Sequence, residues 1–297
     1  MRRVKIITDS CADLTAEQLD RYGIDYAKMS IVYEGVERPA CLTWTAEEAH
    51  ALYELMREGK RITTAQVSVE EFNRVFEHYL ALGMDIVYIG CSSKQSGSVN
   101  TGFVTAKRLM ELYEGRTIIC IDSLNASIGE GMLAIEAAKL ADLGADAKEI
   151  EAHILSIRKR VNEYVTVHSL DALKRAGRVK GTAAFFGNLM GVKPILISDA
   201  NGEQAAYKKV KGRQRSFEQI VTMLKESMID PEEQVVYFTH SDCSAEEVDA
   251  LVTLIKEQIP CRGVEVGFIG PIIGASIGPD AVGIWGFGKE VTYKIGD

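Results

Sequence analysis

The alternation of short apolar runs with helical patterns in the first half of the chain constrains its fold most. Apolar runs at residues 4–7, 86–89 and 117–121 indicate buried strands, and a hydroxyl-rich turn and a helix follow each one. Strands that alternate with helices form a mainly parallel sheet with helices on both faces. The carboxyl ends of parallel strands lie at one edge, so we expect these turns along one edge, where open α/β sheets bind ligands.

The turn Gly90–Ser98 is the richest of them in serine and glycine. It joins the end of a strand to the start of the helix predicted over 99–113, where free backbone N–H groups and the helix dipole favour an anion. Its hydroxyls donate hydrogen bonds without carrying charge. The turn therefore predicts a site for an anionic head group. The alternative is a purely structural turn, since Ser and Gly are ordinary turn and cap residues.

The second half has a different pattern. A hairpin with the turn Asn201-Gly202 beside helical segments indicates a mixed sheet. We therefore predict two domains: an N-terminal α/β domain, 1–160, with a mainly parallel sheet flanked by helices, and a C-terminal α+β domain, 161–297, with a mixed sheet. Smaller expectations are a strand over 24–32, a loop over 35–42, a helix over 183–190 and a glycine-rich tail over 270–288 without an assigned element.

The net charge, the hydropathy and the cysteine content argue against several classes of protein and of binding site. The net charge of −8 over 297 residues argues against a nucleic-acid surface, which needs clustered Lys and Arg. No window approaches the ~20 apolar residues of a membrane span, so no integral membrane segment is expected. The six cysteines are scattered without a Cys-x-x-Cys pair, which predicts reduced thiols in the cytoplasm and neither a disulfide framework nor a zinc site.

A serine-dependent hydrolase is one alternative that the strand-end loops leave open. Its nucleophile would come from Ser10, Ser93, Ser96 or Ser127 and its base from His168 or His240. The nucleophile-elbow pattern Gly-x-Ser-x-Gly is absent, which lowers this prospect, although a triad can form without it. A sugar-phosphate enzyme that uses the same loops is the second alternative.

Nucleotide and metal sites receive less support. Residues 129–134 match Gly-x-Gly-x-x-Ala, but the first glycine follows Asp122 by seven residues and Glu130 would repel a pyrophosphate. The simpler interpretation is that Gly129 and Gly131 let the helix start pack closely, or let a ligand pass. The sequence contains neither the pattern His-x-x-x-His nor the spacing of an EF-hand loop, so no metal site and no cofactor are expected.

Six short segments follow one another along the chain: Thr8–Leu14, Thr64–Ser68, Ser92–Ser98, Asp122–Gly129, Leu173–Val179 and Gly270–Pro279. In this order they resemble the motifs of the DegV family, among them Thr-Asp-Ser-x-x-Asp-Leu, Thr-Ser-Gln-Pro-Ser and Ser-Ser-x-Leu-Ser-Gly-Thr. Each motif alone is weak, but the resemblance covers the whole chain.

The resemblance implies a fatty-acid-binding protein of two α/β domains with a buried acyl chain. In that family the carboxylate is held by a threonine and a serine that match Thr64 and Ser93 here. Some members present the acid to a separate kinase, which makes an acyl phosphate. The resemblance thus implies a carrier subunit that is not an enzyme, with a long-chain fatty acid as its ligand and a fatty acid kinase subunit as its partner.

Around these two residues we expect further contacts from Thr63, Ser96 and Ser276, and a contact with a partner or phosphate from Arg178. Three positions depart from the family pattern. Ala65 removes a hydroxyl near the head group, and Val67 replaces a proline that presets the backbone. Ser276 stands where the family often has a histidine.

Overall fold

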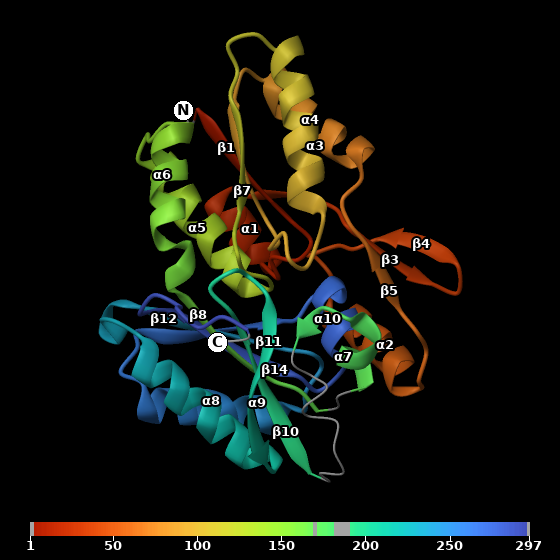
Figure 1. The fold of residues 1–297 in the computed structure, drawn as a ribbon, viewed down its shortest axis with the longest axis vertical. Helices are drawn as coiled ribbons and strands as arrows, with labels where there is room; N and C mark the ends of the chain where they lie inside the picture. The colour runs from red at the N-terminus through yellow and green to blue at the C-terminus, as the bar shows by residue number, and fades with distance from the viewer. Residues whose placement is uncertain (1–2, 169–170, 181–190, 296–297) are drawn as a thin grey trace. The chain divides into compact units, whose positions relative to one another are not determined.

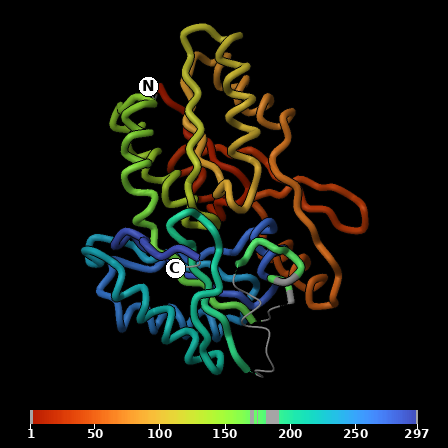
Figure 2. The backbone as a smooth tube through the Cα atoms, viewed as in Figure 1, coloured from red at the N-terminus to blue at the C-terminus, as the bar shows by residue number. Residues whose placement is uncertain are grey.

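The computed structural model describes residues 3–168, 171–180 and 191–295. Its contacts divide the chain into two compact units. Unit 1 comprises residues 1–43 and 64–158, and unit 2 comprises 44–63 and 159–297, so that residues 44–63, which are part of the orange stretch in Figure 2, group with the second half of the chain. The domains 1–160 and 161–297 stay a prediction. The helix expected over 183–190 lies outside the described residues.

Unit 1 is built on a four-stranded parallel sheet in the order β2-β1-β6-β7. This confirms the mainly parallel sheet that the alternating pattern predicts. The residue pairs Val4–Asp85 and Gly90–Asp122 place the carboxyl ends of three strands at one edge. The bounds are β1 (Val4–Asp9), β2 (Asp25–Ala27), β6 (Asp85–Gly90) and β7 (Ile118–Asp122).

Helices cover both faces of this sheet (Figure 1). One face carries α1, α5 and α6, and the other carries α3 and α4. Reciprocal capping boxes at Thr15 and Asp146 start α1 and α6 by satisfying N–H groups of the first turn. The bounds are α1 (Ala16–Tyr22), α3 (Val69–Ala81), α4 (Ser98–Leu112), α5 (Ile128–Asp142) and α6 (Ala147–Ile157).

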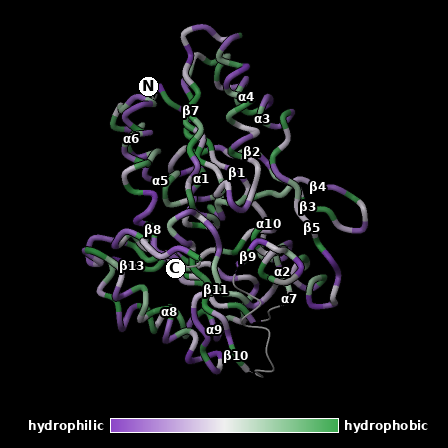
Figure 3. The backbone as a smooth tube through the Cα atoms, viewed as in Figure 1, coloured by the Kyte–Doolittle hydropathy of each residue, from purple (hydrophilic) through white to green (hydrophobic). Residues whose placement is uncertain are grey.

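A small sheet in the order β4-β3-β5 corrects two expectations. The single strand expected over 24–32 is two strands in different sheets, and the loop expected over 35–42 contains β4. Glu34 and Gly35, both with positive φ, make the turn that folds β4 back onto β3, and its tip is hydrophilic (Figure 3). The bounds are β3 (Ser30–Tyr33), β4 (Val36–Pro39) and β5 (Thr63–Ala65).

Unit 2 contains a seven-stranded sheet in the order β13-β12-β14-β8-β10-β11-β9. Its pairs are partly parallel and partly antiparallel, which confirms the mixed sheet. Gly202 adopts φ 81° in the predicted hairpin between β10 and β11. The bounds are β8 (Val161–Thr166), β9 (Val179–Lys180), β10 (Val192–Ser198), β11 (Gln204–Lys211), β12 (Val235–His240), β13 (Gly263–Phe268) and β14 (Val282–Phe287).

The glycine-rich tail contributes α10 and β14, and β14 runs antiparallel between β12 and β8. Trp285 of β14 is fully buried. An apolar cluster that includes Phe217, Ile220 and Phe238 joins α8, α9 and the sheet. The helices of unit 2 are α2 (Ala46–Arg57), α7 (Asp171–Ala176), α8 (Arg213–Ser227), α9 (Ala245–Gln258) and α10 (Pro271–Ile277). Among the described residues, no helix has both the length and the apolar character needed to cross a bilayer.

Candidate functional site

A buried carboxylate joins the ends of β1 and β6. The two oxygens of Asp9 accept hydrogen bonds from the backbone N–H of Cys11 (2.9 Å), the backbone N–H of Cys91 (3.2 Å) and the Tyr88 hydroxyl (2.7 Å). Burial nevertheless raises the pKa of Asp9, against the lowering effect of these bonds. The strand-end loops that the sequence places at one edge are therefore tied to each other.

The turn that carries Ser93 is held from the neighbouring strand. Asp122, the last residue of β7, accepts hydrogen bonds from the backbone N–H groups of Ser93 (3.2 Å) and Leu124 (3.0 Å). The backbone N–H of Ser92 donates to the carbonyl of Asn125 (2.8 Å). These bonds fix the backbone of the turn, while the Ser93 side chain stays exposed.

The segment that carries Thr64 is tied to the start of α4. The backbone N–H of Val67 donates to Ser98 Oγ (3.2 Å), and Gln66 Nε2 donates to Thr101 Oγ1 (2.8 Å). Gly97 permits this approach, since a Cβ there would lie 2.0 Å from Gln66 Oε1. Two loops that are distant in sequence, one with Thr64 and one with Ser93, thus share a single hydrogen-bonded frame within unit 1.

The predicted head-group residues differ in how free their hydroxyls are. Thr64 is half-buried and Ser93 is exposed, and neither hydroxyl has a hydrogen-bond partner among the described residues. The hydroxyl of Ser96 lies 2.9 Å from Ser98 Oγ and accepts from the Ser98 N–H. Thr63 is exposed and groups with unit 2. Their roles toward a ligand stay predictions.

Two further predicted residues belong to unit 2. Ser276 is half-buried on α10. Arg178 is exposed just before β9, and its guanidinium donates to the carbonyl of Ala176 (2.7 Å). Arg178 therefore presents a positive charge to solvent, as its predicted role as a partner or phosphate contact requires.

Two serines considered as nucleophiles have structural roles. The buried Ser10 hydroxyl donates to the carbonyl of Ala40 (2.7 Å) and accepts from the N–H of Met29 (3.0 Å). Ser127 donates to Asp13 Oδ2 (2.5 Å). Both side chains hold loops together, so neither is poised for attack on a substrate.

The close packing expected at the start of α5 is confirmed for Gly131. A Cβ at this position would lie 2.6 Å from the carbonyl oxygen of Ala12 and 2.9 Å from the side chain of Leu14. The glycine lets the helix approach the loop that follows β1, which is the simpler of the two interpretations of residues 129–134.

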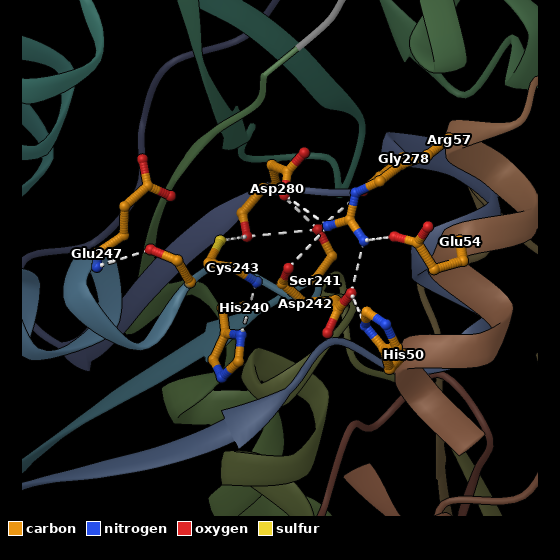
Figure 4. Close-up of polar contacts among 12 residues, drawn as sticks. His50, Glu54, Arg57, His240, Ser241, Asp242, Cys243, Glu247, Gly278 and Asp280 are labelled. Atoms are coloured by element: carbon orange, nitrogen blue, oxygen red, sulfur yellow. Dashed lines mark hydrogen bonds and ion pairs between the residues drawn. The ribbon is translucent and has the colours of Figure 1, made fainter. Parts of the chain in front are cut away.

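A polar cluster in unit 2 surrounds Arg57 at the end of α2 (Figure 4). Its guanidinium donates to Glu54 (2.8 Å), to the side chain and carbonyl of Asp242 (2.6 and 2.8 Å) and to Asp280 (2.6 Å). Burial alone would lower the pKa of Arg57, but the hydrogen bonds to Asp280 and Asp242 raise it. The cluster holds α2 against the loops that precede β14 and follow β12.

Replacing Arg57 with Ala should lower the free energy of unfolding by about 1–2 kcal/mol, because Asp242 and Asp280 lose their shared partner. Arg74→Ala is a matched control on another helix. Among the described residues this exposed arginine forms an ion pair with Glu71 alone, and its loss should cost less than about 0.5 kcal/mol. Urea unfolding measures both. Equal losses would show that the network adds nothing beyond a surface pair.

Sequence reasoning placed Asp9 and Asp122 at strand ends but did not assign the hydrogen bonds that they and Gln66 make. Asp9 and Asp122 stand at the last position of a strand, and that placement is the signal that points to them. Gln66 carries no local signal, because its partner Thr101 lies in a different helix.

Comparisons with known proteins agree with this architecture. The family model described as "Uncharacterised protein, DegV family" matches residues 3–288. A DegV domain-containing protein of Clostridium perfringens is 31% identical over 288 residues, which is 97% of this chain and 98% of that protein. One of Caldanaerobacter subterraneus is 30% identical over 96% of this chain and 99% of its own length.

Solved structures show the same likeness. A DegV lipid-binding protein of Thermotoga maritima has a TM-score of 0.84 at 26% identity, covering 98% of this chain and 100% of its own. A DegV family protein of Thermus thermophilus, described by its fatty acid binding, has a TM-score of 0.86 at 26% identity, covering 97% and 100%. The model match spans nearly every residue of both units, and the chain therefore belongs to the DegV family.

Proposed function

We propose that the protein binds a long-chain fatty acid non-covalently, with the carboxylate held by Thr64 and Ser93. The observation that carries the proposal is the frame in unit 1 that ties the two loops together and leaves both hydroxyls without a partner among the described residues. Thr63, Ser96 and Ser276 are the second-rank contacts, and no cofactor is required. The free cysteines fit a cytoplasmic setting.

The energetics favour an acid with a long tail. A charge-assisted hydrogen bond from a hydroxyl contributes about 1.5–3 kcal/mol, and each buried methylene adds about 0.8 kcal/mol. The tail therefore dominates affinity, while the hydroxyls orient the head group. The T. maritima and T. thermophilus proteins, which are described as lipid and fatty acid binders, support this assignment by their likeness in fold.

The protein is further proposed to present its acid to a separate kinase for acyl-phosphate formation, and not to act as an enzyme itself. A neutral head-group site leaves the carboxylate oxygens available as nucleophiles, whereas a salt-bridging arginine would compete for them. The exposed Arg178 would contact the partner or the incoming phosphate.

The structure shows what valine does at position 67, where the family pattern has proline. Its backbone N–H donates to Ser98 Oγ, a bond that proline lacks the donor to make. The valine therefore replaces a preset backbone with a hydrogen bond between the two site loops, and we expect it to preserve the frame. Ala65 and Ser276 leave the head group with fewer polar contacts.

The combined variant Thr64→Ala and Ser93→Ala should weaken fatty acid binding by at least about tenfold, because two charge-assisted donors are lost. The fold should survive, since neither hydroxyl has a partner among the described residues. Titration with a fluorescent fatty acid measures the affinity. Ser156→Ala is the control, because that hydroxyl donates to the carbonyl of His153 on α6.

Mass spectrometry of the denatured wild-type protein tests the ligand class directly. We expect it to release a fatty acid after expression in lipid-containing cells. Recovery of none would overturn the proposed function, whereas unchanged affinity in the double variant would overturn only the placement of the head group.

A further inference from the structure

A buried group of two thiols and a carboxyl lies at the ends of β1 and β6 and the start of α5. Cys11, Cys91 and Glu130 are each at most 2% exposed, and each offers a ligand atom, all within 4.8 Å of one another. The proposed fatty acid site uses none of these three side chains. Cys11 and Cys91 follow two different strands and Glu130 lies in the first turn of α5, so the three are distant in sequence and no spacing pattern in the sequence indicates them.

One oxygen of the group lacks a partner. Glu130 Oε1 accepts hydrogen bonds from the Thr8 hydroxyl (2.6 Å) and the Asp9 N–H (3.4 Å), but the buried Oε2 accepts none. An unsatisfied buried oxygen is costly unless another group binds it. The carboxyl that carries this oxygen belongs to the same group as the two thiols.

The group also lacks a counter-cation. Among the residues that the structure describes, neither Asp9 nor Glu130 pairs with a basic side chain. Buried charges are normally paired or bound to a metal ion. A cation at this place would satisfy Glu130 Oε2 and offset the negative charge that Asp9 brings.

We propose that Cys11, Cys91 and Glu130 form a structural zinc site. Zinc takes thiolate sulfur and carboxylate oxygen together, whereas Mg²⁺ and Ca²⁺ require oxygen ligands alone. Asp9, whose oxygens accept from the N–H groups of both cysteines, adds a carboxyl beside these three ligands. The ion would join β1, β6 and α5 at the foot of the strand-end loops.

The rival explanation is that protons alone neutralise the group. The hydrogen bond with Cys91 and burial raise the pKa of Cys11. Burial raises the pKa of Glu130. The hydrogen bond with Cys11 lowers the pKa of Cys91, but burial and the negative charge of nearby carboxylates such as Asp9 together raise it. These shifts favour the protonated, neutral forms, and zinc would have to displace their protons to solvent.

The test is refolding with and without metal, because the buried site must acquire its ion as the chain folds. We expect wild-type protein refolded with Zn²⁺ to retain zinc stoichiometrically after gel filtration and to melt at a higher temperature than protein refolded with Mg²⁺ or a chelator. Co²⁺ in place of Zn²⁺ should give the charge-transfer absorption of cobalt bound to thiolate.

Cys91→Ser and the isosteric Glu130→Gln should each lower zinc affinity by more than about tenfold. Cys120→Ser on β7 is the matched control, since it removes a half-buried thiol from the same sheet but outside the group. Wild-type protein that keeps no zinc and shows no cobalt–thiolate band would overturn the proposal, and so would equal zinc retention in all three variants. The wild-type measurements decide the matter even where a variant fails to fold.

Discussion

Replacing Glu163 with Gln should remove a pH dependence of stability of about 3 kcal/mol. Glu163 lies on β8 at the centre of the unit 2 sheet and is almost fully buried. It accepts hydrogen bonds from Gln204 Nε2 (2.6 Å), Trp285 Nε1 (3.2 Å) and the Ser198 hydroxyl (3.3 Å). Burial outweighs these bonds and raises the pKa of Glu163 from 4.5 to about 7.

The direction in which stability changes with pH follows from the protonation of Glu163 below and above its two pKa values. Below pH 4.5 the carboxyl is protonated in the folded and unfolded chains, and above pH 7 it is ionised in both. Between these values the folded state holds the proton more tightly, so stability falls as the pH rises. A difference of about 2.5 pKa units, at about 1.4 kcal/mol each, gives a loss of about 3 kcal/mol.

Urea unfolding at pH 4.5 and pH 8 measures this effect. The stability of Glu163→Gln relative to the wild type should rise by about 3 kcal/mol between the two pH values. Any constant change in stability caused by the amide itself is the same at both pH values and cancels. Glu257→Gln changes an exposed side chain on α9 and should run parallel to the wild type. If the free energy of unfolding of Glu163→Gln changed with pH as that of the wild type does, the prediction would be wrong.

Gly131→Ala should destabilise the protein by about 2 kcal/mol, although alanine is the better helix former by about 1 kcal/mol. The added methyl group would lie 2.6 Å from the backbone oxygen of Ala12, which no side-chain rotation relieves. Helix α5 must then move away from the loop that follows β1, and the Ser127–Asp13 bond at its start should lengthen or break.

Urea unfolding followed by circular dichroism measures the loss. Gly263→Ala is the control, because a Cβ on that residue of β13 would meet no atom within 4 Å and should change stability by less than about 0.5 kcal/mol. A stabilised Gly131→Ala variant would mean that helix propensity, and not close packing, governs this position.

The parallel sheet of unit 1 was predictable because its signals are local. Strands β1, β6 and β7 are apolar runs, hydroxyl-rich turns follow them and the next helices have their own periodicity, so the edge that carries Ser93 followed from the order of elements alone. The small sheet was missed for the opposite reason. Strands β4 and β5 are short and polar, and pairing with β3 defines them more than their own residues do.

The tail shows how glycine misleads a sequence interpretation. Gly283 and Gly286 lie inside β14, where added Cβ atoms would meet the ring of Trp285 and the side chain of Met228. The glycines serve close packing in a central strand, whereas glycine more often signals turns. Likewise, the grouping of Cys11, Cys91 and Glu130 depends on two strand-end loops and the start of α5, which are distant in sequence, so residue spacing does not indicate it.

The position of β14 also bears on how the protein is made. A ribosome releases the chain from its N-terminus, and β14 lies between β12 and β8 in the unit 2 sheet. The sheet therefore stays open along its middle until residue 287 has emerged, while the strands of unit 1 are all available by residue 122. The strands of unit 1 can therefore pair during synthesis, whereas α2, which is made early, must wait for its partners in unit 2.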